Sequence, residues 1–279
     1  MAKINWFPGH MAKALRDMAE EVKKVDMIIY VLDARAPKSS VNPEFLAIIG
    51  NKPILYVLNK SDMVEAHHLD EFKAYFKQEN TEVIDLNSTQ TWAIKKIEPI
   101  MIKLCKEKLE KYKAKGFKIN LRAMVLGIPN SGKSTLINNL CGVKKAITGD
   151  KAGVTRGKQW LSLKNGFEVL DTPGTLWPNI TNQQMAQNLA FIGSIRNEVV
   201  DMGELAVDLL NYLKKHHKDS LMQKYNIKND SLTAIEMLEH IAQQKHYLLK
   251  GAEPDYERTC FAIIDDFRKG KFGKIVLDN

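Results

Sequence analysis

The sequence predicts an α/β fold of three layers, in which a mostly parallel sheet lies between helices, followed by an all-α C-terminal part. Two observations support this prediction. Short apolar, β-branched runs alternate with helical patterns over the first two thirds of the chain, as in sheets whose strands are buried on both faces. Beyond about residue 180 the strand signals stop and helical patterns follow one another.

Six segments are expected to be strands, and each is a short apolar run that ends at turn residues. They are residues 27–34, 54–60, 82–88, 122–127, 159–163 and 167–171. Ligands of such sheets bind at the carboxyl ends of the strands. Three polar loops follow strands directly, so we expect them to meet at one edge of the sheet.

The later part of the chain has apolar residues at every third or fourth position, which predicts amphipathic helices. The predicted helices cover residues 181–193, 203–217, 219–225, 231–247 and 254–269. We therefore expect two domains, one of residues 1–178 and a helical one of residues 179–279.

The stretch GIPNSGKS at 127–134 matches the phosphate-binding pattern G-x-x-x-x-G-K-[ST]. Its glycines allow backbone N–H groups to surround phosphates at the start of a helix. Lys133 is expected to reach the β- and γ-phosphates and the Ser134 hydroxyl to bind Mg²⁺. Further nucleotide contacts are expected from Asn130, Ser131, Gly132 and Thr135.

The stretch DTPG at 171–174 follows another predicted strand. Asp171 is expected to hold Mg²⁺ through water, and the backbone N–H of Gly174 to meet the γ-phosphate. GVTR at 153–156 lies between these two motifs in the chain, and Thr155 is a candidate for a second Mg²⁺ ligand.

The stretch NKSD at 59–62 indicates which base is bound. Asp62 can accept hydrogen bonds from N1–H and the amine of guanine, an edge that adenine does not present. We expect Asn59 to bond O6 or N7, and the stem of Lys60 to cover the ring and tie this base loop to the phosphate loop. Ser88, in LNST after the next strand, is a candidate for the contact to O6.

These motifs resemble those of the circularly permuted GTPases of the YlqF/YawG family. WFPGHMAKA at 6–14, VLDARAP at 31–37 and the order NKSD, GIPNSGKS, GVTR, DTPG carry the resemblance, which extends over nearly the whole chain. It implies a P-loop GTPase fold, GTP hydrolysis and a role in late assembly of the large (50S) ribosomal subunit. The chain is cut just after DTPG, so both the N-terminal segment and the helical part start at the loop that senses the γ-phosphate.

Many GTPases orient the attacking water with a glutamine after D-x-x-G, but this chain has Thr175 there. His10 is the candidate to replace it, because its segment is expected to start near that loop and the resembling family uses this histidine in catalysis; the alternative is a structural anchor. Asn130 corresponds to an asparagine that holds K⁺ in related GTPases, and the alternative is local bonding. Arg35 is interpreted as half of an Asp33–Arg35 pair that holds a turn.

The chain carries a net charge of +8, and the excess lies in residues 101–177, with 15 basic and 5 acidic side chains. The densest part, 101–122, is either a solvated helix face or a surface for phosphate backbones. The sequence has no apolar run of membrane-spanning length and no signal peptide, and its three separated cysteines suit a reducing cytoplasm.

Two functions from different classes follow. The first is a GTPase, slow alone and stimulated by the subunit, that binds rRNA and ribosomal proteins of the large subunit and leaves on hydrolysis. The second is a signalling switch whose helical part binds a non-ribosomal protein. A small-molecule kinase is disfavoured, because it needs no guanine-reading loop. We expect a monomer that binds GTP and GDP.

Overall fold

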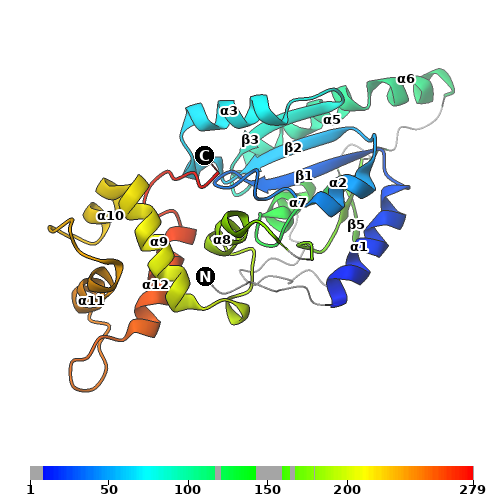
Figure 1. Cartoon of the computed structure of the whole chain (residues 1–279). Coiled ribbons are helices and arrows are strands. Elements are labelled where there is room, and N and C mark those ends of the chain that lie inside the picture. The colour runs from blue at the N-terminus through cyan, green and yellow to red at the C-terminus, as the bar shows by residue number, and fades with distance from the viewer. Residues whose placement is uncertain (1–8, 117–120, 143–158, 164–166, 179, 279) are drawn as a thin grey trace.

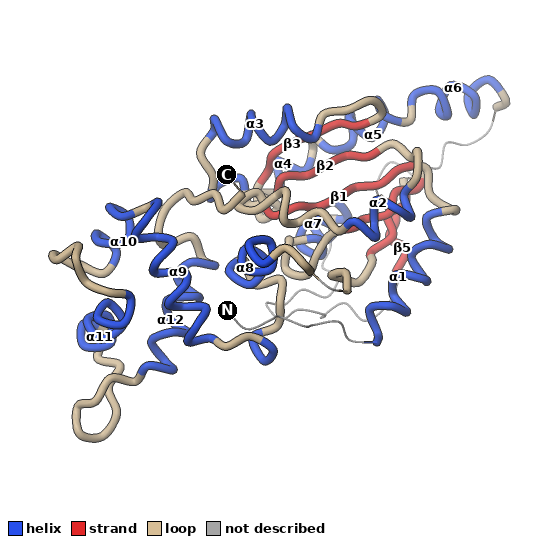
Figure 2. Tube along the Cα trace, in the orientation of Figure 1, coloured by secondary structure: helices blue, strands red, loops and turns tan. Residues whose placement is uncertain are grey.

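The computed structural model of the protein describes residues 9–116, 121–142, 159–163, 167–178 and 180–278. A sheet of six strands lies at the centre of the described residues (Figures 1 and 2). Across the sheet the order is β3 (Thr81–Leu86), β2 (Ile54–Asn59), β1 (Met27–Asp33), β4 (Arg122–Leu126), β6 (Glu168–Asp171) and β5 (Gln159–Ser162). Neighbouring strands pair in parallel, except that β5 runs antiparallel to β6.

All six predicted strands are confirmed, with ends that differ by one or two residues. Every residue of β1 and β2 is buried, as expected for central strands that are covered on both faces. The predicted ends were less accurate than the predicted strands, because pairing with a neighbour and not local pattern sets where a strand stops.

Two layers of helices cover the sheet. One face packs against α1 (Gly9–Val22), α2 (Pro43–Ile49) and α3 (Ala66–Phe76), and the other against α5 (Ile97–Leu104), α6 (Lys106–Ala114) and α7 (Lys133–Cys141). A short α4 (Thr91–Ile94) precedes α5. Alternate residues of β1 enter the two cores: Ile28, Tyr30 and Leu32 face α1–α3, while Met27 and Ile29 face α5–α7. The three-layer α/β prediction is therefore confirmed.

The remaining helices form a layer of their own beside the carboxyl edge of the sheet (Figure 1). These C-terminal helices are α8 (Gln183–Phe191), α9 (Met202–His216), α10 (Lys218–Lys224), α11 (Ala234–Gln244) and α12 (Tyr256–Arg268). Local signals define them: Asn182, Asp201 and Asp255 cap α8, α9 and α12, and Thr233 with Glu236 forms a capping box at α11.

One apolar core joins the C-terminal helices to the sheet edge. Ile128 in the phosphate loop and Leu176 and Trp177 after DTPG pack in the same cluster as α8, α9, α11 and α12. The chain then returns: residues after α12 run back to the loops at the carboxyl edge, where the C-terminus lies in Figure 1.

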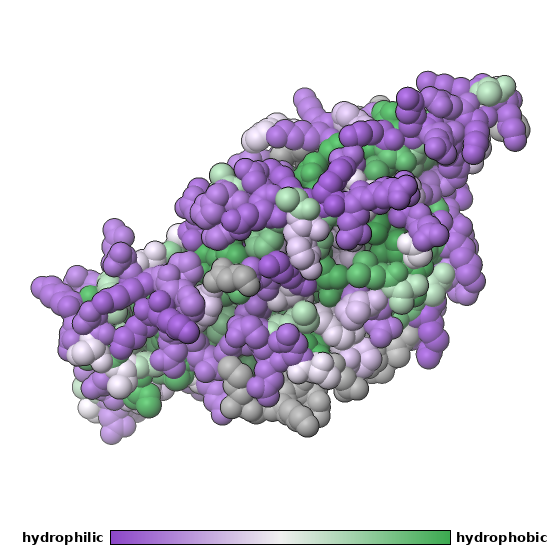
Figure 3. All heavy atoms as spheres, turned by 45° about the horizontal axis from the view of Figure 1, so that its top comes forward, coloured by the Kyte–Doolittle hydropathy of each residue, from purple (hydrophilic) through white to green (hydrophobic). Residues whose placement is uncertain are grey.

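The opposite end of the molecule is different. Helix α6 projects away from the body in Figure 1, and the corresponding end of the molecule in Figure 3 is covered by hydrophilic side chains. None of the described helices is long and apolar enough to span a bilayer.

Candidate functional site

The phosphate loop joins β4 to α7 through two glycines that the backbone requires. Gly127 and Gly132 have φ angles of +155° and +94°, and a Cβ on Gly132 would overlap the side-chain amide of Asn59. Gly132 also caps α7, so the amino end of that helix opens on the loop. Backbone N–H groups and a helix amino terminus make this a site for anionic phosphate groups.

Lys133 and Asp171 lie at the floor of the site. Both side chains are buried, and Lys133 Nζ donates to the carbonyl of Ile128 at 2.8 Å. Asp171 Oδ1 is a buried oxygen with no hydrogen-bond partner among the described residues. Burial raises the pKa of Asp171 to about 6, against the opposing charge of Lys133, and burial lowers the pKa of Lys133 to about 8. The buried ammonium and the partnerless carboxylate oxygen suit a polyphosphate and a metal ion, respectively.

The loop after β6 lies against the phosphate loop. A Cβ placed on Gly174 would lie 2.7 Å from Lys133 Nζ and 2.9 Å from the backbone of Pro129. Only glycine allows this approach, because any side chain would displace the phosphate loop or its lysine. Thr175, at the position where many GTPases have glutamine, is buried, and its hydroxyl has no partner among the described residues.

The base loop after β2 is tied to the phosphate loop by two hydrogen bonds. Asn59 Nδ2 donates to the carbonyl of Ser131 at 2.7 Å, and Lys60 Nζ donates to the carbonyl of Asn130 at 2.9 Å. Lys60 has a left-handed backbone, which turns the chain so that the exposed Asp62 follows in a short 3-10 helix, η1 (Ser61–Met63). The structure thus brings together three loops that are far apart in the sequence.

A hydrogen bond joins Ser88 to Asn59. The Ser88 backbone N–H donates to Asn59 Oδ1 at 2.9 Å, and the Ser88 carbonyl accepts from Asn139 of α7. Asn59 therefore joins the base loop to both the phosphate loop and the loop after β3. In this arrangement the amide of Ser88 that was expected to meet guanine O6 is already engaged by Asn59.

The other predicted residues divide into described and undescribed ones. Ser134 and Thr135 are half-buried in the first turn of α7, and Ser131 Oγ donates to the carbonyl of Ile128 at 3.0 Å. Thr155 lies outside the described residues. The backbone of His10 lies in the first turn of α1, and its side chain lies outside what the structure describes.

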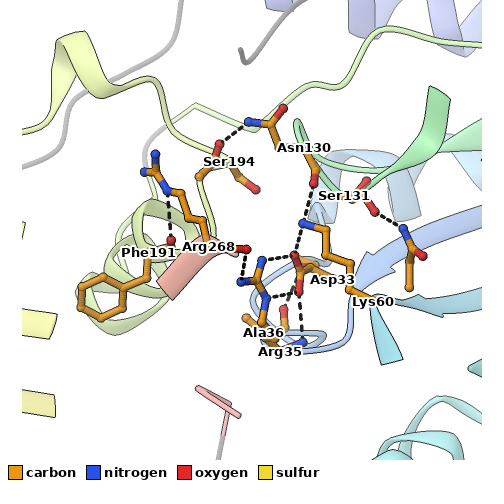
Figure 4. Close-up of polar contacts among 12 residues, drawn as sticks. Asp33, Arg35, Ala36, Lys60, Asn130, Ser131, Phe191, Ser194 and Arg268 are labelled. Atoms are coloured by element: carbon orange, nitrogen blue, oxygen red, sulfur yellow. Dashed lines mark hydrogen bonds and ion pairs between the residues drawn. The ribbon is translucent and has the colours of Figure 1, made fainter. Parts of the chain in front are cut away.

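Asn130 makes a contact that the sequence did not indicate. Its side-chain amide donates to the carbonyl of Gly193 at 2.7 Å, and beside it Ser194 Oγ donates to the carbonyl of Pro129 at 2.8 Å (Figure 4). Gly193 and Ser194 directly follow α8. This bond joins the phosphate loop to the segment after α8, 63 residues along the chain.

Arg35 forms the expected pair with Asp33 and also contacts the end of α12. Its Nε and Nη2 donate to the two carboxylate oxygens of Asp33 at 2.9 and 2.8 Å, and Lys60 Nζ donates to the same carboxylate at 2.8 Å (Figure 4). Arg35 Nη1 also reaches the carbonyls of Phe267 and Arg268 at the end of α12. Sequence reasoning missed the last two contacts, because nothing local in VLDARAP refers to a helix 232 residues away.

Comparison with known proteins agrees with this geometry. The family model described as "50S ribosome-binding GTPase" matches residues 122–248. The match begins at the first residue of β4 and leaves out the base loop, as expected for a chain in which that loop precedes the phosphate loop.

Relatives match over the full length. Ribosome biogenesis GTPase A of Bacillus cereus is 39% identical over 276 residues, covering 99% of this chain and 93% of that protein. The protein of the same name from Priestia megaterium is 37% identical and is covered to 96%. A solved structure of GNP-bound YlqF from T. maritima has a TM-score of 0.63 and 26% identity, with 95% of this chain and 97% of that chain covered.

The loops after β2, β4 and β6 lie together in permuted order, and the relatives match the chain over nearly its whole length. The chain is therefore a GTPase that belongs to the ribosome biogenesis GTPase A family.

Proposed function

We propose that this GTPase is an assembly factor of the large (50S) ribosomal subunit, that it binds rRNA and ribosomal proteins there, and that hydrolysis releases it. The relatives are named for ribosome biogenesis, and the matching family is described as binding the 50S ribosome. We place it in the cytoplasm, with which the buried free thiols of Cys105 and Cys260 agree. We expect it to act as a monomer.

The observation that carries the proposal is the direct connection between base loop and phosphate loop through Asn59 and Lys60. A nucleotide that lies between these loops has its base over the Lys60 stem and beside Asp62. Its phosphates lie at the amino end of α7, within reach of Lys133 and the Gly174 backbone. Ser88 supports this site by holding Asn59.

The side chains present suit Mg²⁺. The described residues hold no cluster of three or more His, Cys, Asp or Glu side chains that could hold a metal by itself. Mg²⁺ in nucleotide sites needs no such cluster, since phosphate oxygens and waters supply most of its ligands. The partnerless oxygen of Asp171 and the hydroxyl of Ser134 would hold the ion, together with Thr155. When bound, Mg²⁺ neutralises charge on the β- and γ-phosphates.

The described residues leave the orientation of the attacking water to another group. Thr175 is buried and Leu176 is apolar, so neither replaces the glutamine of other GTPases. We propose His10 for this role, because imidazole orients and polarises water near neutral pH. We propose further that the amide oxygen of Asn130 holds K⁺, while the amide nitrogen bonds Gly193.

The chain divides into two parts in this proposal. We propose a permuted GTPase domain of residues 1–178 and a helical domain of residues 179–279. Separate apolar clusters support this division: two enclose the sheet, and a third lies mainly among α8–α12.

The decisive experiment is GTP hydrolysis with and without purified large subunits, with small subunits as the matched particle. We expect slow turnover alone and a rise of at least about 100-fold with large subunits, since stimulated GTPases gain from about 10³ to 10⁵. His10→Ala should lose that rise, whereas His67→Ala on the exposed side of α3 should keep it. Replacing K⁺ by Na⁺ tests the role of Asn130.

Several outcomes would contradict the proposal. Equal rates with large and small subunits at every salt concentration would remove the ribosomal function. Full stimulation of His10→Ala would remove His10 from the mechanism. A nuclease-resistant complex with one non-ribosomal protein, together with no effect of ribosomal particles, would favour the signalling switch.

A further inference from the structure

A buried ionic cluster lies beside the base loop and has no role in the functions described above. Asp33 and Arg35 are only 1% and 2% exposed, and their two-point pairing is formed by the last residue of β1 and the turn after it. Burial by itself would raise the pKa of Asp33, but the charges of Arg35 and Lys60 and their hydrogen bonds lower it well below its usual range. The carboxylate is therefore charged at neutral pH.

The third arm of the Arg35 guanidinium holds the end of a helix. Nη1 lies 3.3 Å from the carbonyl of Phe267 and 3.2 Å from that of Arg268, which is the last residue of α12. The last carbonyls of a helix lack partners within it and carry its negative end. The planar fork of arginine can bind a carboxylate and these carbonyls together, which a lysine ammonium cannot do in the same geometry.

The same carboxylate holds the lysine of the base loop. Lys60 Nζ lies 2.8 Å from Asp33 Oδ2 and also donates to the carbonyl of Asn130 in the phosphate loop. One buried anion thus connects a side chain expected to cover the guanine ring with the side chain that caps α12.

A second route, through the phosphate loop, also connects the nucleotide site to the C-terminal helices. Asn130 and Ser194 bond the phosphate loop to the residues after α8, and the Arg268 side chain donates from α12 to the carbonyls of Ala190 and Phe191 in α8. Figure 4 shows the Asn130 contact and the bond from Arg268 to Phe191 beside the cluster of Asp33, Arg35 and Lys60. The base loop is therefore connected through Asp33 and Arg35 to α12, the phosphate loop is bonded to the residues after α8, and Arg268 joins the two helices.

We propose that Asp33 and Arg35 are positioning residues that couple guanine-nucleotide binding to the docking of α12. A nucleotide that fixes the Lys60 stem also fixes the Lys60–Asp33 bond, and the ordered carboxylate then holds Arg35 against α12. Ordering a lysine side chain is unfavourable, so whichever partner orders it first makes the second step easier. Coupling of this kind is reciprocal, so docked α12 strengthens nucleotide binding by the same factor.

The experiment measures both directions of the coupling in the full chain. The variant Arg35→Lys keeps a positive charge beside Asp33 but loses the fork. We expect its Kd for GDP to rise about tenfold, within the range of typical coupling energies. Hydrogen exchange with and without saturating GDP supplies the second measurement. In the wild type GDP should slow exchange at residues 265–273, and in Arg35→Lys that protection should be lost while protection at 131–136 remains.

Two controls and a second variant keep the test sharp. Arg122→Lys changes an exposed arginine paired with Glu168 and should leave both measurements unchanged. Ser194→Ala removes one of the two bonds of the second route with little change of shape, and should weaken GDP binding a few-fold. Ser231→Ala, an exposed serine among the C-terminal helices, is its control.

The coupling is wrong if GDP affinity in Arg35→Lys stays within twofold of the wild type. It is equally wrong if GDP protects residues 265–273 as well in Arg35→Lys as in the wild type. If Arg35→Lys does not fold, Asp33→Glu takes its place in both measurements, since it keeps the charge but displaces the carboxylate from the Arg35 fork. No ribosomal particle takes part in these measurements, so the coupling can hold where the proposed ribosomal function fails, and the reverse.

Discussion

Single residues in this protein show how a nucleotide loop excludes ordinary side chains. Gly132 has a φ angle of +94°, which residues other than glycine rarely adopt, and it lies against the Asn59 amide, where a Cβ would not fit. Both features require glycine at this position. The hydrogen bond from Asn59 to the Ser131 carbonyl depends on that approach.

Gly132→Ala should therefore lose the connection between base loop and phosphate loop. We expect the Kd for GDP to rise at least about tenfold, which corresponds to about 1.4 kcal/mol. The matched control is Gly116→Ala, which also has a positive φ of +66° but has nothing within 4 Å of the added Cβ. The control should cost about 1 kcal/mol of stability and keep nucleotide affinity. Fluorescent-nucleotide titration and urea unfolding measure the two quantities.

The lowered pKa of Asp33 predicts how the stability of the protein depends on pH. Its pKa in the folded protein lies below the unfolded value of about 3.9, so its stabilising contribution is complete above that pH and is lost as the pH falls toward the folded pKa. Asp33→Asn should lower the free energy of unfolding by about 3–5 kcal/mol at pH 7, because Arg35 remains buried without its anion.

The difference between the wild type and Asp33→Asn should shrink by roughly 1 kcal/mol between pH 5 and pH 3. Denaturant unfolding at several pH values measures it. The exposed Asp70, paired with Lys73, supplies the control Asp70→Asn, which should change stability by less than about 0.5 kcal/mol. An equal difference at pH 3 and pH 7 would contradict the prediction.

At the scale of elements, the segment after α12 connects the C-terminal helices to the loops after β1 and β2. The backbone of Leu277 donates to the carbonyl of Arg35 at 2.7 Å, and that of Ile275 to the carbonyl of Met63 at 3.0 Å. Asp278 accepts from the backbone and hydroxyl of Ser39 and from the amide of Asn188 on α8.

Asp278→Ala should destabilise the protein by about 2–4 kcal/mol, because it leaves the buried backbone and hydroxyl donors of Ser39 without their acceptor. The control is Lys274→Ala in the same segment. Lys274 is exposed in its pair with Glu65, so this change should alter stability by less than about 0.5 kcal/mol. Thermal and urea unfolding distinguish the two. Similar losses in both variants would show that the whole segment, and not the Asp278 contacts, provides the stability.

At the scale of the whole molecule, charge and shape place a basic projection opposite the C-terminal helices. Helix α6 extends away from the sheet, and Lys111, Lys113 and Lys115 are exposed on or next to it (Figure 1). Net charge of +8 together with this projection favours contact with an RNA backbone.

Replacing Lys111, Lys113 and Lys115 by glutamine should weaken binding to large subunits and flatten its salt dependence. Each phosphate contact contributes about 0.7–0.9 to the slope of log K against log salt, so the slope should fall by about 2 if most of these lysines bind. Intrinsic GTP hydrolysis should not change. The matched variant replaces Lys228, Lys245 and Lys250, exposed lysines of the C-terminal part. An equal change in that variant would place the RNA contact on the C-terminal helices instead.

The strands, the C-terminal helices and the three polar loops could be predicted from local pattern alone. Periodic apolar residues, the glycines at 127 and 132, and the caps at Asn182, Asp201 and Thr233 act within a few residues of the chain. The meeting of NKSD with GIPNSGKS followed as well, because parallel strands bring their carboxyl ends to one edge.

The contacts of Arg35 with α12 and of Asn130 with Gly193 could not be found in this way. They join atoms 232 and 63 residues apart, and their partners are backbone carbonyls, which every residue carries and no motif marks. The packing of α8 and α12 against the loops selects which carbonyls these side chains reach. Short sequence motifs therefore predict the chemistry of the site. Its connection to the C-terminal helices is decided by the tertiary structure, because packing selects which backbone carbonyls lie within reach.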